Sequence, residues 1–350
     1  MNLTEIAFYA RGAIKYTIIF VILLVVGRFA WNIGYRVYIS YFPPSPPPPT
    51  IVWGKLPPLH FPEKPGLPTF SYTLQTATGE LPKLTTTMPV YFMPKQQISF
   101  LKLEEAQELA ANLRFPGTGT PLSETIYRFS REGTSLTLDI NTVNKTLSVN
   151  YRLSDSPELL TLKLKSQEEA ARDASSFLSS AGLLTEDLQK GNISFEFLRV
   201  DGDQLVTTGS LSEANFVRVN FFRQPVGETP VVAPNRKKAN VWFLVTGSDD
   251  RDLRIIAGEY HYFPIDLAQS STYPLKTTQA AWDELVSGKA YIAQYGQDVT
   301  KITVRKIYLA YYDSGTAQGF LQPVIVFEGD GGFVAYVSAV TPDQHTTTSD

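Results

Sequence analysis

The stretch PPSPPPPTIVWGKLPPLHFP, residues 43–62, divides the chain into two parts of different composition. An apolar segment precedes it, and the residues after it have the mixed composition of a folded domain. Positions 43–68 hold eleven of the chain's twenty-four prolines. Proline fixes φ and has no backbone N–H to donate, so this stretch cannot extend a helix that comes before it. We therefore expect it to separate an apolar helix from a domain.

The apolar segment starts with YTIIFVILLVVG (16–27), which carries no charge. Twelve helical residues span only about 18 Å, so a helix that crosses a bilayer must continue through Arg28. A central arginine costs about 2.5–3.5 kcal/mol on insertion scales, which the Ile, Val and Leu side chains offset. We predict a transmembrane anchor over residues 16–39. Its representative residues are Tyr16, Ile18, Phe20, Leu23, Val26, Arg28 and Trp31.

Three other structures are open to this segment. A cleaved signal peptide requires a small-residue site such as Ala-x-Ala, and none follows the apolar run. A buried helix of a soluble domain can have the same length. An amphipathic surface helix requires a polar face, which the run lacks. The membrane anchor is the interpretation that the composition favours.

Basic residues flank the segment on both sides. Arg11 and Lys15 precede it, whereas Arg28 and Arg36 lie within or after its second half. The positive-inside rule therefore separates the two sides only slightly. We expect a short cytoplasmic tail at 1–15 and an extracytoplasmic C-terminal domain, in a single-pass protein of the cell membrane.

Residues 40–68 are predicted to form a proline-rich stalk followed by an apolar strap. The run at 43–49 favours polyproline II, which extends about 3.1 Å per residue and acts as a semi-rigid spacer. A docking peptide for a polyproline-binding domain is the alternative. The second half is too apolar for a bare tether, so we expect it to lie against the domain as an extended strap. Its apolar residues are Ile51, Val52, Trp53, Leu56, Leu59 and Phe61.

Three segments have helical periodicity, at 101–113, 165–183 and 276–290. The second begins with Ser166 followed three residues later by Glu169, the spacing of a capping box. Alternating β patterns follow each helix and predict antiparallel strands. The expected strands lie at 71–76, 88–94, 124–153, 192–200, 216–224, 238–247, 254–265, 302–313 and 321–340.

The order of these elements predicts an α+β protein with tandem helix-plus-antiparallel-sheet modules. We place the modules at 69–160, 161–272 and 273–342. The polar tail at 343–350, which contains His345, is expected to be disordered.

The sequence contains no recognisable catalytic or metal-binding motif. It has no cysteine, which excludes disulfides and thiolate ligands. Glu259 and His261 share a strand face near Asp266, but nothing completes a metal shell. The carboxylates of SDDRD (248–252) lack the spacing of a calcium loop, and GDGG (329–332) is interpreted as a hairpin turn. We therefore expect no catalytic residue, cofactor or metal.

The segment VRKIYLAYYDSGTAQGFLQPVIVFEG (304–329), with the helix at 276–290 before it, resembles the late strand pair of the YycH/YycI proteins and their PepSY-like relatives. That resemblance implies a membrane-anchored extracytoplasmic protein that regulates an envelope-sensing histidine kinase and has no enzymatic activity. The stalk and strap are not typical of that family, which suggests an uncharacterised bacterial family with the same module and a different client.

The aromatic strands are the candidate surface for a partner. Tyrosine-rich exposed surface suits binding of a protein or a glycan. The residues that could form it are Tyr308, Tyr311, Tyr312 and Phe320.

Three function classes follow. The first is a non-enzymatic, membrane-tethered extracytoplasmic binding or regulatory module that acts on another membrane or envelope protein. The second is a structural scaffold of the envelope or of a surface appendage. The third is a carboxylate-based hydrolase, which needs two facing carboxylates about 5–9 Å apart. A net charge of −3 does not indicate a nucleic-acid partner. The sequence does not predict an oligomeric state.

Overall fold

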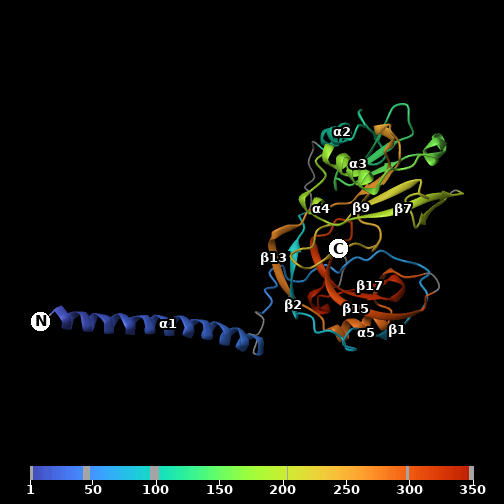
Figure 1. Cartoon of the computed structure of the whole chain (residues 1–350). Coiled ribbons are helices and arrows are strands. Elements are labelled where there is room, and N and C mark those ends of the chain that lie inside the picture. Colours follow the sequence, from blue (N-terminus) through green and yellow to red (C-terminus); the bar gives the residue numbers. More distant parts are fainter. Residues whose placement is uncertain (1–2, 42–47, 95–101, 203, 297–298, 347–350) are drawn as a thin grey trace. The chain divides into compact units, whose positions relative to one another are not determined.

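The computed structural model describes residues 3–41, 48–94, 102–202, 204–296 and 299–346 (Figure 1). The chain divides into two units, Met1–Pro48 and Pro49–Asp350. The predicted stalk falls partly outside the described residues, since positions 42–47 are not among them.

The first unit is the helix α1 (Leu3–Tyr41). Its stretch Lys15–Tyr38 has a mean hydropathy of 2.0, and none of it is buried in the structure. This apolar stretch agrees with the predicted span at 16–39, but α1 itself already begins at Leu3, within the predicted tail. The stretch is long and apolar enough to span a membrane or to act as a signal sequence. The representative residues of the predicted anchor are exposed along it: Tyr16, Ile18, Phe20, Leu23, Val26, Arg28 and Trp31.

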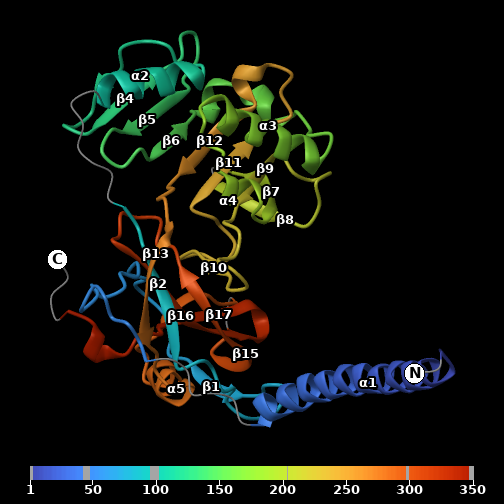
Figure 2. The ribbon, with the colours of Figure 1, turned by 90° about the vertical axis from the view of Figure 1, so that its left-hand side faces the viewer.

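The strands of the described residues form two sheets in the second unit, one of nine strands and one of eight. Figure 2 shows them as two lobes, which we call the nine-stranded lobe and the eight-stranded lobe. The nine-stranded lobe takes its strands from residues 120–260, whereas the eight-stranded lobe combines 71–92 with 231–232 and 266–338.

The nine-stranded sheet is antiparallel throughout. In spatial order its strands are β3 (Thr120–Pro121), β4 (Ile126–Ser130), β5 (Thr137–Asn141), β6 (Leu147–Asn150), β12 (Ile255–Tyr260), β11 (Val241–Val245), β9 (Phe216–Phe221), β7 (Ile193–Asp201) and β8 (Gln204–Thr208).

Both faces of this sheet are covered. Because side chains alternate along a strand, Phe243 of β11 packs with the helix side, whereas Trp242 and Leu244 pack on the opposite side. The helix side holds α2 (Lys102–Asn112), α3 (Gln167–Ser180) and the short α4 (Glu186–Gln189). The other side holds the 3-10 turns η1 (Leu153–Asp155) and η2 (Pro157–Leu160).

The predicted capping box is confirmed at the start of α3. The Ser166 hydroxyl accepts a hydrogen bond from the Glu169 backbone N–H at 3.1 Å. Ala170, Ala174 and Leu178 recur every four residues and are buried against the sheet. Gly182, with φ +66°, lies just beyond the helix end.

The eight-stranded sheet includes two parallel pairs. The main path runs β1 (Ser71–Leu74), β15 (Lys301–Tyr312), β16 (Phe320–Gly329), β17 (Phe333–Ser338) and β14 (Tyr291–Gln294). The strands off this path are β2 (Thr87–Phe92), β13 (Asp266–Pro274) and β10 (Val231–Val232). Both β1 and β10 pair with β15 in parallel, and the other pairs are antiparallel.

The helix α5 (Thr278–Val286) covers one face of this sheet through Ala281 and Leu285. The opposite face packs against Val232 and against Leu59 and Phe61 of the strap. The expected GDGG turn is present as η4 (Asp330–Gly332), between β16 and β17. Two further 3-10 turns are η3 (Arg251–Leu253), between β11 and β12, and η5 (Pro342–Gln344), after β17.

The strap, residues 49–62, lies against the eight-stranded lobe. Leu56 is completely buried and pairs with His345 in a parallel bridge. Trp53 packs 4.9 Å from Phe320, and Phe61 stacks 5.0 Å from Tyr291, both measured between ring centroids. The segment is therefore part of the lobe rather than a free tether.

The expected disordered tail at 343–350 is wrong for its first half. The Leu56 N–H donates to the Gln344 carbonyl, and the Thr346 N–H donates to the Leu56 carbonyl, each at 2.8 Å. These bonds satisfy backbone groups that the buried Leu56 would otherwise leave unpaired. Residues 347–350 lie outside the described part.

The tandem modules at 69–160, 161–272 and 273–342 are not confirmed. The boundary between the first two does not separate sheets, because β6 pairs with β12. The strands β1 and β2, expected in the first module, belong to the eight-stranded sheet. The α+β class and the three helices agree with the sequence. The sequence did not predict the short helix α4 or the strands β3, β8, β10, β13 and β14.

Candidate functional site

The aromatic residues that the sequence offered as a partner surface are not arranged as one. Tyr311 and Tyr312 are 1% and 0% exposed, because β15 is an inner strand covered on both faces. The Tyr308 hydroxyl donates to Glu328 at 2.6 Å, and Phe320 packs between Trp53 and Phe92. Burial raises the pKa of both buried tyrosines.

The candidate acidic residues also have local partners. Glu259 accepts a hydrogen bond from the Trp242 indole at 2.9 Å and lies 3.3 Å from the Lys238 ammonium. Burial alone would raise the pKa of Glu259, but these two partners lower it. His261 Nδ1 lies 3.1 Å from the Gly315 carbonyl, and Asp266 accepts from Ala268 in its own turn.

The 248–252 segment is the connection between β11 and β12. Asp252 there lies 2.8 Å from Arg114, so its carboxylate is engaged in an ion pair. Within the described ranges, no group of three or more His, Asp or Glu side chains is placed to hold a metal ion.

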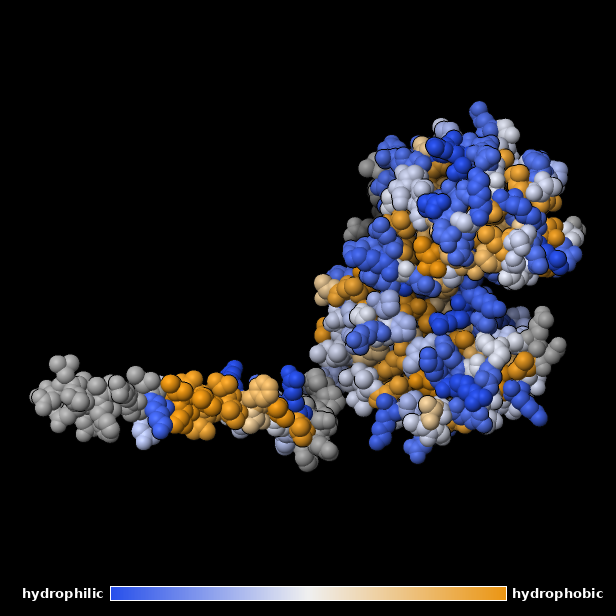
Figure 3. Space-filling view, in the orientation of Figure 1, coloured by the Kyte–Doolittle hydropathy of each residue, from blue (hydrophilic) through white to orange (hydrophobic). Residues whose placement is uncertain are grey.

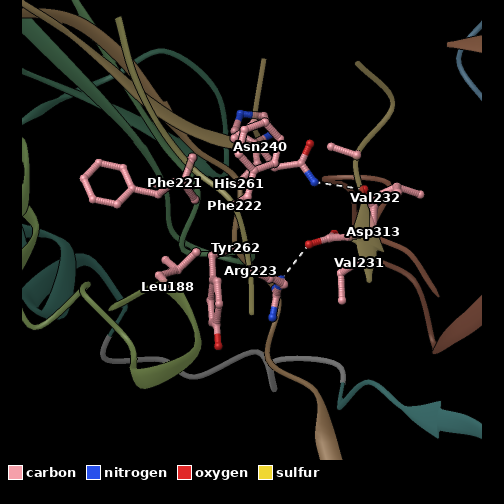
Figure 4. A pocket seen from close by; sticks show the side chains of 13 residues that line it. Leu188, Phe221, Phe222, Arg223, Val231, Val232, Asn240, His261, Tyr262 and Asp313 are labelled. Carbon is pink, nitrogen blue, oxygen red and sulfur yellow. Dashed lines mark hydrogen bonds and ion pairs between the residues drawn. The ribbon is translucent and has the colours of Figure 1, made fainter. Parts of the chain in front are cut away.

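The two lobes meet around the buried side chain of Arg223, which follows β9 (Figure 4). Its guanidinium donates to Asp313 of the eight-stranded lobe at 2.6 Å and to Asp187 of α4 at 2.8 Å. It also donates to the Phe263 carbonyl and lies 4.0 Å from the ring centroid of Tyr262. Burial would lower the pKa of Arg223, but the charges of Asp313 and Asp187 raise it.

The space beside Arg223 is a cavity of about 20 Å³. That volume suits a water molecule and excludes an organic ligand. An arginine also stays protonated in proteins, so Arg223 is unsuited to acid–base chemistry. The geometry is that of a joint between the lobes.

Besides the contacts of Arg223, the segment 225–240 also connects the two lobes. It leaves the nine-stranded sheet after β9 and crosses to the other lobe, where β10 pairs with the end of β15. There the hydroxyls of Tyr336 and Tyr291 donate to the carbonyls of Ala233 and Pro234, at 3.1 and 2.9 Å. Burial raises the pKa of Tyr291 to about 12, so both hydroxyls remain donors at neutral pH.

The same segment borders an open cleft of about 310 Å³, which we call the basic cleft. Figure 3 shows the surface hollowed where the two lobes meet, with hydrophilic residues on both sides. Four cations and one carboxylate line the cleft. Its lining residues are Lys64, Glu196, Arg218, Asn235, Lys237, Lys238, Ala293, Gln294 and Tyr295.

Two of the four cations have a carboxylate partner. Arg218 pairs with Glu196, and Lys238 pairs with Glu259. Both cations also lie over the Trp242 ring, at 5.0 and 4.3 Å from its centroid. These contacts fix the positions of the two charges at the floor of the cleft.

Lys64 and Lys237 are not neutralised by any carboxylate of the described residues. Lys64 donates to the carbonyls of Ile292 and Ala293, at 2.8 and 2.7 Å, along the edge strand β14. Burial lowers the pKa of Lys64, and no neighbouring carboxylate opposes that effect. Lys237 is exposed.

A larger depression, of about 440 Å³, lies between α2 and the turn that follows α3. Its lysine, Lys145, is 3.1 Å from Glu105. Glu108 also lines this depression, so its lining carries no excess of positive charge that would attract an anion. The basic cleft is therefore the candidate site.

Sequence reasoning missed the basic cleft. Its cations are separated by up to 174 positions, from Lys64 to Lys238. They come from the residues just after the strap, from β9 and from the segment 225–240. The only local signal is the pair of adjacent lysines in NRKKAN (235–240), which follows a proline-containing turn.

Comparison with known proteins adds little to this geometry. No family model and no curated protein matches the chain. Among solved structures, the crystal structure of an uncharacterized protein from Eubacterium rectale is similar at 13% sequence identity. The match covers 75% of this chain and 85% of that chain with a TM-score of 0.35, a likeness that carries no argument.

Proposed function

We propose that this chain is a single-pass membrane protein whose C-terminal domain lies outside the cytoplasm. There it binds and regulates another membrane or envelope protein and catalyses no reaction. The observation that carries the proposal is the exposure of α1 over Lys15–Tyr38. Leaving a large aliphatic side chain in water rather than burying it costs about 1.5–3 kcal/mol, so a helix apolar on all sides favours hydrocarbon.

The second unit supports a binding role. Its strap packs on the eight-stranded lobe from Ile51 onward, so a tether would join a folded domain directly. Its basic cleft presents charges fixed by ring contacts and ion pairs. The resemblance of residues 276–329 to the YycH/YycI proteins favours regulation over scaffolding.

Membrane topology can be tested directly because the chain has no cysteine. We expect Leu205→Cys, at an exposed position of β8, to react in intact cells with a maleimide that does not cross membranes. Thr4→Cys should react only after permeabilisation. The reverse pattern, or recovery of the unmodified protein in the soluble fraction, would contradict the proposal.

Partner identity is tested by crosslinking the full-length tagged protein in its native membrane. Recovery of a sensor kinase or another membrane-spanning regulator would support the proposal. Recovery mainly of the protein itself, or of wall components, would support a structural scaffold instead.

Arg28 offers a variant that is specific for the membrane segment. A charge within an apolar span is stabilised by a carboxylate of a neighbouring helix. We expect Arg28→Leu to reduce the crosslinked complex while leaving the thermal unfolding of the domain unchanged. An unaltered complex would exclude a role of Arg28 in partner binding.

A further inference from the structure

We infer that the basic cleft binds an acidic peptide segment of the partner protein, whose carboxylates contact Lys64 and Lys237. This inference rests on the proposed binding function and adds the chemistry of the partner to it. Four observations carry it: uncompensated charge, fixed donors, size and the peptide-like lining of the cleft.

The cleft carries an excess of positive charge. The chain carries a net charge of −3, yet the residues that line the cleft comprise four cations and one carboxylate. Lys64 has lost part of its hydration to burial and has gained two carbonyl contacts and a contact with the Tyr291 ring in return, but no carboxylate of the described residues pairs with it. An ammonium in that position is stabilised by an anion that enters beside it, because the pair restores the lost interaction energy.

The donors of the cleft are held in place before a ligand arrives. The Arg218 guanidinium lies on Trp242 and pairs with Glu196, while its Nε is buried with no hydrogen-bond partner among the described residues. Asn235 accepts from the backbone N–H groups of Lys237 and Lys238, at 2.8 and 3.1 Å. That turn fixes the backbone from which both lysines extend, so little conformational entropy of the backbone is lost on binding.

The size and lining favour a peptide over a single small anion. A volume of about 310 Å³ is at the lower limit of sites that enclose organic ligands of several groups. The cleft also contains the amide side chains of Asn235 and Gln294 and the ring of Tyr295, which is 39% exposed. Amides suit a peptide backbone, and an exposed tyrosine suits its side chains.

The edge strand β14 contributes main-chain groups to the same place. Its Ile292 and Ala293 carbonyls are covered by the Lys64 ammonium, which protects an otherwise unpaired sheet edge. A carboxylate that attracts Lys64 competes with these two contacts. Binding of an acidic segment therefore also changes the protection of this edge.

The test uses the full-length protein in detergent micelles and a fluorescently labelled hexaglutamate peptide, read by anisotropy. Hexaglutamine with the same label is the uncharged control peptide. We expect binding of hexaglutamate only, weakened strongly at about 1 M salt, where the Debye length is about 3 Å. Equal binding of both peptides would overturn the inference.

Substitutions then locate the binding. We expect Lys237→Gln to weaken hexaglutamate binding by about fivefold, and Lys64→Gln with Lys237→Gln to weaken it by about tenfold or more. Lys289→Gln removes the same charge from an exposed position outside the cleft and should have no effect. Equal losses for Lys289→Gln and Lys237→Gln would overturn the inference, as would unchanged binding in the double variant.

Inorganic phosphate distinguishes the source of the anionic group. If phosphate displaces hexaglutamate at concentrations where chloride of equal ionic strength does not, the cleft is a small-anion site and the peptide assignment is wrong. Failure of the inference is separable from failure of the proposed function. A crosslinked partner complex that Lys237→Gln leaves intact would refute the cleft assignment and preserve the binding role.

Discussion

The two lobes of the second unit both cover a sheet on two faces, but they differ in how far apart in sequence their paired strands lie. In the nine-stranded lobe, hairpins join most neighbouring strands, and the widest strand pair, β6 with β12, joins residues about 110 positions apart. In the eight-stranded lobe, β1 pairs with β15 between Ser71 and Lys301, 230 positions away in sequence. The nine-stranded lobe is assembled mostly from local strand pairs, whereas the eight-stranded lobe adds distant pairs to its two consecutive hairpins, β15 with β16 and β16 with β17.

That difference has an energetic consequence. Distant pairs require loop closure before they contribute stability, so folds rich in them form slowly. The eight-stranded lobe therefore depends on connectors that hold remote segments together: the strap, the segment 225–240 and the Arg223 network. Changes to these connectors should therefore cost more stability than changes to local contacts.

The largest effect is expected for Arg223→Met. Removing the guanidinium leaves the carboxylates of Asp313 and Asp187 without their buried counter-charge, which typically costs about 3–5 kcal/mol. We expect urea unfolding to shift accordingly and to separate into two transitions, one for each lobe. Arg199→Met, which removes an exposed pair with Asp201, is the matched control and should change stability little. A single unshifted transition would show that Arg223 does not couple the lobes.

The next largest effect is expected for Leu56→Ala in the strap. Truncating a completely buried leucine costs about 2–5 kcal/mol, and the loss should fall on the eight-stranded lobe. Hydrogen exchange should show faster exchange in β15 and β16 with little change in β9 and β11. Val52→Ala, at a side chain that is 71% exposed, is the control. Equal acceleration in both lobes would mean that the strap stabilises the whole unit.

A smaller and local effect is expected for the two helix caps. Ser166 and Thr277 each accept a backbone hydrogen bond at the start of a helix, from Glu169 and Ala280. Replacing either residue with alanine should cost about 1 kcal/mol. Hydrogen exchange should report Ser166→Ala only in α3 and Thr277→Ala only in α5. An effect that crosses to the other lobe would contradict the local character of these contacts.

The smallest effect is expected from protonation of His345. Burial lowers the pKa of this ring, which lies 3.3 Å from the Pro57 carbonyl and also near the charge of Lys276. The unfolded chain therefore binds a proton at a higher pH than the folded chain does. The resulting stability is present above the ordinary pKa of about 6.5 and is lost as the pH falls from that value through the lower pKa of the folded chain. Thermal unfolding at pH 8 and 5.5 measures this loss, which His345→Gln should abolish; an equal pH dependence in that variant would exclude His345.

The sequence predicts those parts that depend on local chemistry. Ser166 and Gly182 mark the ends of α3 because a hydroxyl cap and a positive φ are local requirements. The alternation in 302–313 identifies β15 for the same reason. By contrast, β13 reads DLAQSSTYP, a polar segment without alternation, and it is a strand only because β2 lies beside it.

The candidate site could not be predicted in this way. Lys64 and Lys237 are ordinary surface lysines in sequence. They line the same cleft only because the residues after the strap and the segment 225–240 both lie on the eight-stranded lobe. The same holds for Tyr311 and Tyr312, whose burial depends on which strands flank β15. The position of the two lysines and the burial of the two tyrosines both depend on strand partners that are far apart in sequence.

The bridge between Leu56 and residues 344–346 also sets an order of events during synthesis. The strap leaves the ribosome early, but its pairing partner is made after every strand of both sheets. The nine-stranded lobe can fold as soon as residue 260 has emerged, whereas the eight-stranded lobe must wait with its first strands unpaired. β2 has no partner until β13 has been made, and β1 has none until β15 follows, so a nascent chain stalled between residues 260 and 301 presents unpaired strand edges to proteases and chaperones.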